Sequence, residues 1–169
     1  SLTLLPGTLP EGDELAGVRL DAGYAYSLER LAPNRFFVVD VHDPAHPRLL
    51  ATSILNLGTI DGFEVEGGSL HTLARSGSNL TYRLYTLGEP GEIFAITHSG
   101  SVTLSDATAS GLAVIDSVAT FLRSSGDPET ELYSFHGEAT PGAPLQSTAL
   151  PDAYCYRGTT AEIGDLFAI

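Results

Sequence analysis

The chain has 169 residues, which is long enough for one domain with a sizeable core, and 43% of them are hydrophobic. All eight basic residues are arginine, and the lack of lysine excludes Schiff-base chemistry and a P-loop nucleotide site. The net charge of −13 is spread along the chain, which argues against binding to nucleic acid or to anionic membrane surfaces.

Three further absences limit the possible classes of protein. No apolar run approaches the roughly 20 residues that a helix needs to cross a bilayer, so we expect no membrane insertion. Cys155 is the single cysteine, which excludes an internal disulfide and a CxxC motif. The chain has no methionine, so we expect that Ser1 was produced by processing and that the chain is part of something larger.

Short apolar runs separated by Gly, Pro, Asp and Ser recur along the chain and are typical of β-strands. The one helical candidate is the segment 116–123, and its β-branched and aromatic residues suit a strand as well. The runs form units of similar length at 18–55, 63–99 and 112–149, followed by a partial unit at 150–169 to which an N-terminal strand at 1–6 is expected to add.

The units repeat with a period close to that of one propeller blade. Val41, Leu87 and Phe135 each end the third strand of a unit and lie 46 and 48 residues apart. Four strands in about 45 residues is the size of one blade. We therefore predict an all-β, β-propeller-like fold, with about three four-stranded blades plus a partial fourth in a single domain, 1–169. The alternatives are a small closed ring and a fragment of a larger propeller.

One unit carries a recognisable motif. The strings "GYAYSL" and "FFVVDVHDPAHPRLLAT" resemble the LVIVD-type repeat and related secreted β-propeller families. The matching residues are Gly23, Tyr26, Val38, Val39, Asp40, Val41, Asp43, Pro44 and Pro47. The other units keep the rhythm but have Tyr85 and Ser134 at the motif aspartate. The resemblance implies a propeller in an extracellular or periplasmic setting and implies little about activity.

The histidines after the third strand of the first unit raise the question of a metal site. His42, Asp43 and His46 are residue types that bind zinc. Pro44 and Pro47, however, prevent the helix that would bring positions 42 and 46 to one face. We interpret this stretch as a strand followed by a turn, in which the aspartate accepts local backbone N–H groups.

The remaining histidines and the cysteine are interpreted as follows. His71 lies in the middle of a strand and is expected to be packed there. His98 is expected to open the longest connection, 98–111, where function often concentrates. A metal shared by His42 and His136 is not expected, because a whole blade separates them. Cys155 is expected to be a small buried residue.

Carboxylates in the predicted loops on one propeller face could hold a cation. Ca²⁺ bound by carboxylates and loop carbonyls is chemically reasonable there, and solvated acidic loops are the alternative. The candidate ligands are Asp61, Asp106, Asp127 and Glu129.

Two functions follow from these observations. The leading hypothesis is a non-enzymatic extracellular or periplasmic propeller segment that acts as a protein-interaction, structural or assembly subunit. Its partner would be another protein, or further copies of this chain that complete the propeller. The rival is part of a hydrolase or lactonase-like propeller enzyme with carboxylate-bound Ca²⁺, although no G-x-S-x-G motif is present.

Overall fold

A computed structural model describes residues 14–90, 94–115, 117–124, 130–136 and 146–150. Strands account for the regular structure of these residues, and no helix in them is long and apolar enough to cross a membrane. The strand bounds are Leu15–Asp21 (β1), Tyr24–Glu29 (β2), Arg35–Asp40 (β3), Arg48–Ile54 (β4), Thr59–Glu66 (β5), Ser69–Ser76 (β6), Asn79–Leu87 (β7), Ile96–Leu104 (β8), Thr108–Ile115 (β9), Val118–Ser124 (β10), Thr130–His136 (β11) and Gln146–Leu150 (β12).

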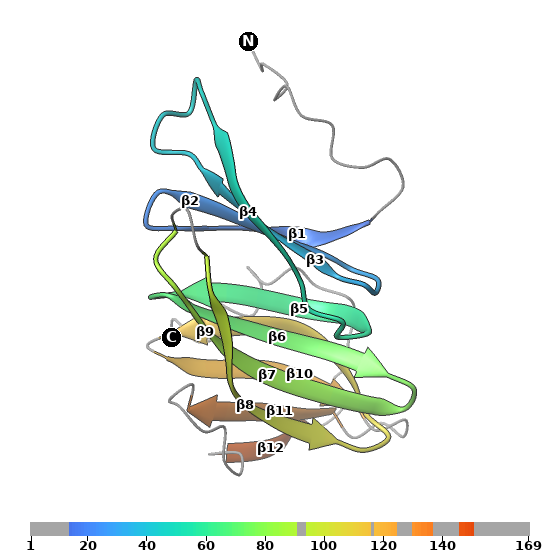
Figure 1. Ribbon diagram of the computed structural model, residues 1–169. Coiled ribbons are helices and arrows are strands. Elements are labelled where there is room, and N and C mark those ends of the chain that lie inside the picture. The colour runs from blue at the N-terminus through green and yellow to red at the C-terminus, as the bar shows by residue number, and fades with distance from the viewer. Residues whose placement is uncertain (1–13, 91–93, 116, 125–129, 137–145, 151–169) are drawn as a thin grey trace.

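The strands form three antiparallel sheets of four, each built from consecutive strands (Figure 1). We call them blade 1 (β1 to β4), blade 2 (β5 to β8) and blade 3 (β9 to β12). Neighbouring strands are paired in chain order within every blade. This up-and-down order is the one that a propeller blade has, so the all-β, propeller-like prediction is confirmed.

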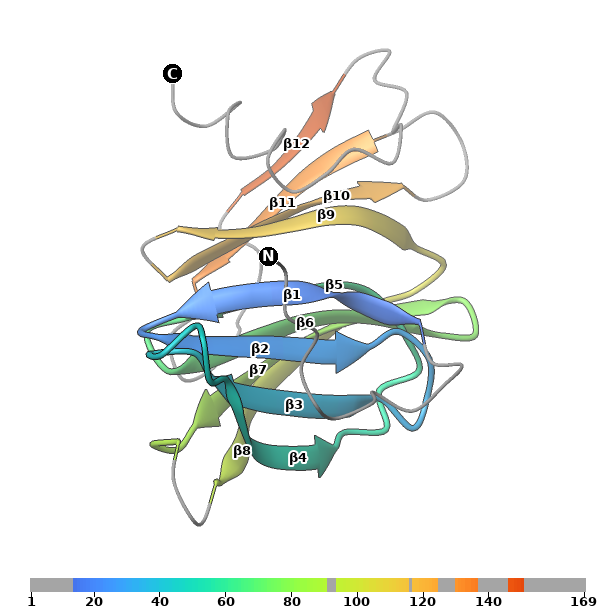
Figure 2. The same ribbon diagram turned by 90° about the horizontal axis from the view of Figure 1, so that it is seen from above.

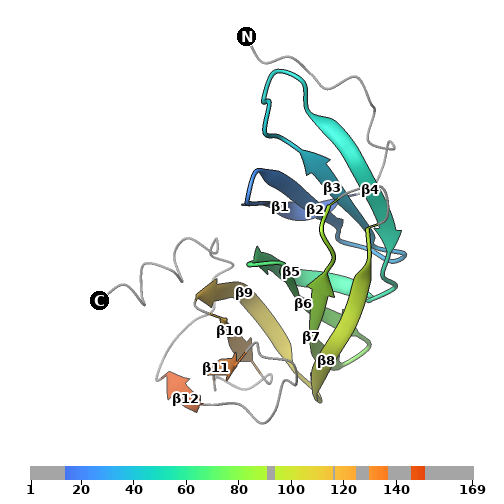
Figure 3. The ribbon, with the colours of Figure 1, turned by 60° about the vertical axis from the view of Figure 1, so that its left-hand side comes forward.

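The first strands of the blades lie together at the centre of the assembly. Strand β5 packs against β1 on one side and β9 on the other, and the sheets spread outward from there like a fan (Figure 3). Gly62 of β5 permits this approach, because a Cβ there would lie 3.0 Å from the Cβ of Leu112 in β9. The centre of the fan thus corresponds to the axis of a propeller.

Blades 1 and 2 repeat even their irregularities. A bulge interrupts the pairing of the third and fourth strands between Val38 and Val39 in blade 1, and between Leu84 and Tyr85 in blade 2. In blade 1 the bulge begins at Val38, two residues before Asp40, which pairs with the first residue of β2. In blade 2 it begins at Leu84, two residues before Thr86, which pairs with the first residue of β6. Shared bulges of this kind are features of a repeated unit and not chance distortions.

Two hydrophobic cores join the blades, and Figure 2 shows blade 3 on the far side of blade 2 from the outer strands of blade 1. The first core lies between blades 1 and 2, and the second between blades 2 and 3. The first contains Tyr26, Leu28, Phe36 and Val38 from blade 1 with Phe63, Val65, Leu70 and Tyr85 from blade 2. The second contains Leu73, Leu80, Tyr82 and Leu84 from blade 2 with Leu112, Ala119 and Phe121 from blade 3.

Side chains alternate along β3, because Phe36 and Val38 face blade 2, whereas Phe37, which is 5% exposed, and Val39 point the other way. The segment 116–123, which suited either a helix or a strand, contributes to strand β10.

The prediction of a long connection at 98–111 was wrong. Strand β8 continues to Leu104 and β9 begins at Thr108, so a short turn replaces the loop. His98 is an internal residue of β8, where it pairs with Tyr85. The small and hydroxyl side chains of this segment have weak strand propensity. The segment is a strand here because it pairs with β7 and β10. The predicted strand at 1–6 and most of the partial unit, from 151 on, lie outside the described residues.

Candidate functional site

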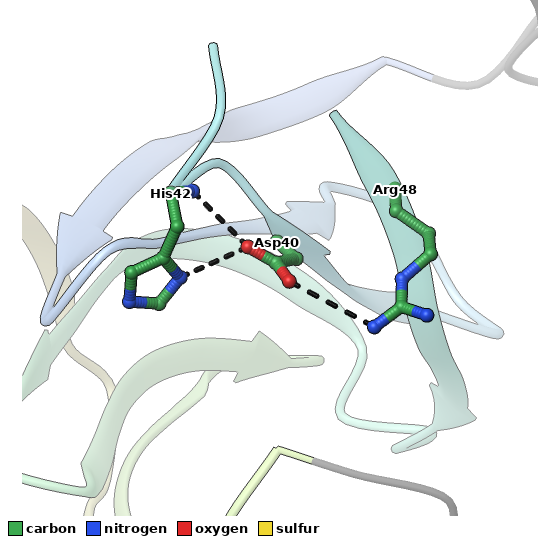
Figure 4. Close-up of polar contacts among 3 residues, drawn as sticks. All are labelled: Asp40, His42 and Arg48. Atoms are coloured by element: carbon green, nitrogen blue, oxygen red, sulfur yellow. Dashed lines mark hydrogen bonds and ion pairs between the residues drawn. The ribbon is translucent and has the colours of Figure 1, made fainter. Parts of the chain in front are cut away.

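The turn after β3 contains a fully local set of polar contacts (Figure 4). The backbone N–H of His42 donates to Asp40 at 3.0 Å, and the imidazole Nδ1 lies 2.9 Å from the same carboxylate oxygen. The Arg48 guanidinium lies 3.8 Å from the other oxygen. The backbone hydrogen bond, followed by the imidazole contact, lowers the pKa of Asp40.

A second pair follows three residues later and remains separate from the first. Asp43 accepts the backbone N–H of Ala45 at 3.0 Å and contacts the imidazole of His46 at 2.8 Å. The His46 contact, then the Ala45 hydrogen bond, lowers the pKa of Asp43. Each histidine therefore contacts the aspartate that lies two or three residues before it, and each aspartate accepts a backbone N–H as in an Asx turn. This pattern supports the turn interpretation over a metal site.

The structure explains why the repeat motif has a glycine at position 23. Gly23 has a φ of +84°, and a Cβ there would lie 2.4 to 2.7 Å from ring atoms of His42. Tyr24 then meets the His42 ring edge-on, with 4.9 Å between the ring centroids. Gly23, Tyr24 at the start of β2 and the turn that follows Asp40 therefore pack against one another at one end of blade 1.

The structure places Asp61 in an ion pair. Both carboxylate oxygens accept hydrogen bonds from Arg75, one of them at 2.8 Å, and the aspartate side chain is only 7% exposed. The same hydrogen bonds raise the pKa of Arg75. Such a bidentate pair occupies the oxygens that a cation would need. The sequence contained a signal for this ion pair, because Arg75 lies in the strand after the one that carries Asp61.

The other candidate calcium ligands are not gathered around Asp61. Asp106 is exposed in the β8–β9 turn and has a φ of +48°. Asp127 and Glu129 lie outside the described residues. Among the residues that are described, no three His, Cys, Asp or Glu side chains form a group suited to a metal ion. The four-carboxylate calcium site stays a prediction.

A thermal melt with and without millimolar calcium tests that prediction. Calcium held by these carboxylates is expected to raise the Tm of the wild-type chain, and the rise is expected to disappear in Asp106→Ala. Since Asp61 already pairs with Arg75, Asp61→Ala is expected to lower the Tm even without calcium. A wild-type Tm that calcium does not change would reject the site in favour of solvated acidic turns.

The most unusual surface of the described chain is an apolar face of blade 1 that sequence reasoning missed. Val18 is 54% exposed and Leu20 is 74% exposed, although both lie in the innermost strand of the blade. Their counterparts, counted back from the end of the first strand, are Phe63 and Val65 in blade 2, which are 1% and 8% exposed. The sequence carried no local signal of this difference, because the equivalent positions are apolar in both blades.

We call this surface the entry face, because in blade 2 the equivalent face packs against the preceding blade. One row of the entry face crosses all four strands of blade 1 through paired residues, and every member is apolar. The row consists of Leu20, Ala25, Val39 and Leu49. Leu49 is 59% exposed, so the row ends in a second uncovered apolar side chain at the outer strand.

An ion pair at the centre of the fan joins blades 1 and 2. Arg19 lies between Val18 and Leu20, but its side chain points to the opposite side, where its Nε is 2.6 Å from Glu64. Its guanidinium also lies over the ring of Phe63, 5.2 Å from the centroid. Burial raises the pKa of Glu64, and the ion pair with Arg19 opposes that rise. The alternation leaves the apolar neighbours of Arg19 on the entry face.

Comparisons with known proteins bear on the fold alone. No family model and no curated protein matches the chain. Solved structures do match, and one is the crystal structure of the computationally designed Ika4 protein. The TM-score is 0.58 at 12% identity, over 92% of this chain and 81% of that chain. The sheets of this chain therefore resemble those of a designed all-β protein.

One buried titratable group lies between blades 2 and 3. His71 is 1% exposed, as the sequence predicted for a packed histidine, and its Nδ1 lies 2.7 Å from the hydroxyl of Tyr82. Burial lowers the pKa of His71 to about 4, and burial also raises the pKa of Tyr82. The imidazole is neutral in the folded protein at neutral pH, so this pair is a packed polar contact inside the core.

His71 makes the stability of the chain depend on pH. Its pKa is near its ordinary value of about 6.5 when unfolded and about 4 when folded, so the unfolded chain binds more protons between these values. We expect the free energy of unfolding to fall by up to about 3 kcal/mol as the pH falls from 6.5 to 4. Urea unfolding across this range measures the slope. His71→Phe should reduce this slope.

Proposed function

We propose that this chain is a non-enzymatic propeller subunit that binds another protein through the entry face of blade 1. The observation that carries the proposal is the exposure of Val18 and Leu20 at positions that are buried in blade 2. In blade 2 the same positions are buried because blade 1 covers them. Exposed large apolar side chains gathered on one sheet face are typical of a protein-binding surface.

The chemistry of the surface supports a protein partner over other partners. Val18, Leu20, Leu49 and Ile54 are all more than half exposed, so covering them would remove apolar area from water. The net charge of −13 opposes binding to phosphate backbones and to anionic lipid. Arg19 of β1 lies between Val18 and Leu20 but is paired with Glu64 on the other side of the sheet.

The LVIVD-type resemblance extends this proposal to the setting of the protein. Gly23, Asp40 and Asp43 of the motif have defined roles in the turn of blade 1, which supports membership in that kind of repeat. We accordingly propose an extracellular or periplasmic location. The hydrolase alternative has no comparable support, because Asp40, Asp43 and Asp61 are each paired with a His or Arg, and the described His, Cys, Asp and Glu residues form no group of three that could hold a metal ion.

Photo-cross-linking in an extract of the source cells tests the proposed function. A photoreactive phenylalanine analogue at Leu20 is expected to give a cross-linked product of discrete mass, in which mass spectrometry identifies one protein. The same analogue at Ser101, an exposed residue of β8, is the matched control and is expected to give no such product. Equal labelling at the two positions, or none at Leu20, would contradict the proposal.

A further inference from the structure

At the opposite end of the array, no other described blade packs on the outer side of blade 3. The fifth residue of the second strand is leucine in every blade, at Leu28, Leu73 and Leu122. Leu28 and Leu73 are 0% exposed, because the following blade covers them. Leu122 is only half-buried. We call the face that carries these leucines the exit face.

The two uncovered faces belong to one kind of interface. Inside the chain, the exit face of blade 1 packs on the entry face of blade 2, and the exit face of blade 2 packs on the entry face of blade 3. Among the described strands, packing of comparable extent does not join blade 3 to blade 1. The chain therefore carries both halves of its own repeated interface, one at each end of the array, and neither half packs on another blade among the described strands.

We propose that the partner on the entry face of blade 1 is blade 3 of a second copy of this chain. The inference rests on the proposed function and names its partner. Exit-to-entry contact is heterologous, so two copies can pair at both ends and close a ring. Two sets of three blades give six, which is within the usual range of about four to eight for a closed propeller. The negative charge of each copy opposes the pairing, so salt strengthens it.

Two variants that block one face each provide the test. Leu20→Arg places a charge on the entry face, and Leu122→Arg places one on the exit face. In sedimentation equilibrium, the wild-type chain is expected to reach twice its mass of 17.8 kDa. Each variant alone is expected to be monomeric, with association weakened at least tenfold. A mixture of the two is expected to form a dimer, because each supplies the face that the other lacks.

The same experiments separate this arrangement from its alternatives. If Leu122→Arg alone still dimerises, the entry faces pair with each other and the inference is wrong. A wild-type chain that stays monomeric also overturns it, and if Leu20 still cross-links to a different protein in the extract, the proposed function survives. Circular dichroism shows whether each variant folds.

A wild-type measurement covers the case in which Leu122→Arg does not fold. The photoreactive analogue at Leu20 is introduced into isotope-labelled chain and mixed with unlabelled chain. Cross-links from the labelled chain to β10 of the unlabelled chain are expected. Cross-links confined to residues 151–169 of the same chain would overturn the inference.

Discussion

Replacing Phe36 with alanine is expected to lower the free energy of unfolding by about 3 to 5 kcal/mol. Phe36 is 0% exposed and lies in the core between blades 1 and 2. Its ring is stacked with Tyr26 at 5.9 Å and with Phe94 at 6.4 Å between centroids. The substitution removes these contacts and leaves a cavity in a core that two sheets share, so urea unfolding followed by circular dichroism should show a large shift of the midpoint.

Leu49→Ala, measured at dilute protein concentration where the entry face is unpaired, is the matched control, because Leu49 belongs to the same blade but is 59% exposed. A surface substitution of this kind is expected to change the free energy of unfolding by about 0.5 kcal/mol or less. Similar losses in Phe36→Ala and Leu49→Ala would mean that blade 1 does not pack on blade 2 through the face described above.

Replacing Asn34 with alanine is expected to destabilise the chain by about 3 kcal/mol or more. Asn34 lies in the β2–β3 connection of blade 1, and its buried side chain holds the connection between blades 1 and 2. Its Oδ1 accepts the backbone N–H of Leu57 at 2.7 Å, and its Nδ2 donates to the carbonyl of Gly58 at 2.8 Å and of Glu29 at 3.2 Å. Alanine would leave these buried backbone groups without partners. Urea unfolding measures the loss.

Asn34→Gly separates the hydrogen bonds from the backbone conformation. Asn34 has a φ of +51°, which asparagine tolerates and glycine adopts freely, whereas alanine adds strain of about 1 kcal/mol. The glycine variant is therefore expected to remain strongly destabilised, although less so than the alanine variant. Full stability in Asn34→Gly would show that the side-chain hydrogen bonds contribute little.

Local patterns in the sequence were sufficient for much of the fold. The recurring short apolar runs predicted the strands, because a strand between two blades needs apolar side chains on both faces. The Asp-Pro turn after β3 was also predictable, since Asp43 and its proline act on adjacent backbone groups. Structure that is determined within a few residues can be inferred from those residues.

Features that depend on distant pairing could not be inferred in this way. The segment 98–111 has weak strand propensity by itself and becomes strand through pairing with β7 and β10. Asp61 appeared to be a free loop carboxylate because its partner, Arg75, is 14 residues away in the next strand. The exposure of Leu20 is the clearest case, because nothing in its own sequence distinguishes it from the buried Val65.

The central claim is that every blade uses one kind of face to pack on its predecessor, and that blade 1 lacks a predecessor within the described chain. Leu20→Ala and Leu112→Ala test it most directly, because both remove the same side chain from the entry face of a first strand. Leu112 is 0% exposed and Leu20 is 74% exposed. Urea unfolding at dilute protein concentration is expected to show a loss of about 2 to 5 kcal/mol for Leu112→Ala and about 0.5 kcal/mol or less for Leu20→Ala. Equal losses would show that the face of blade 1 is covered within the chain and would contradict the account.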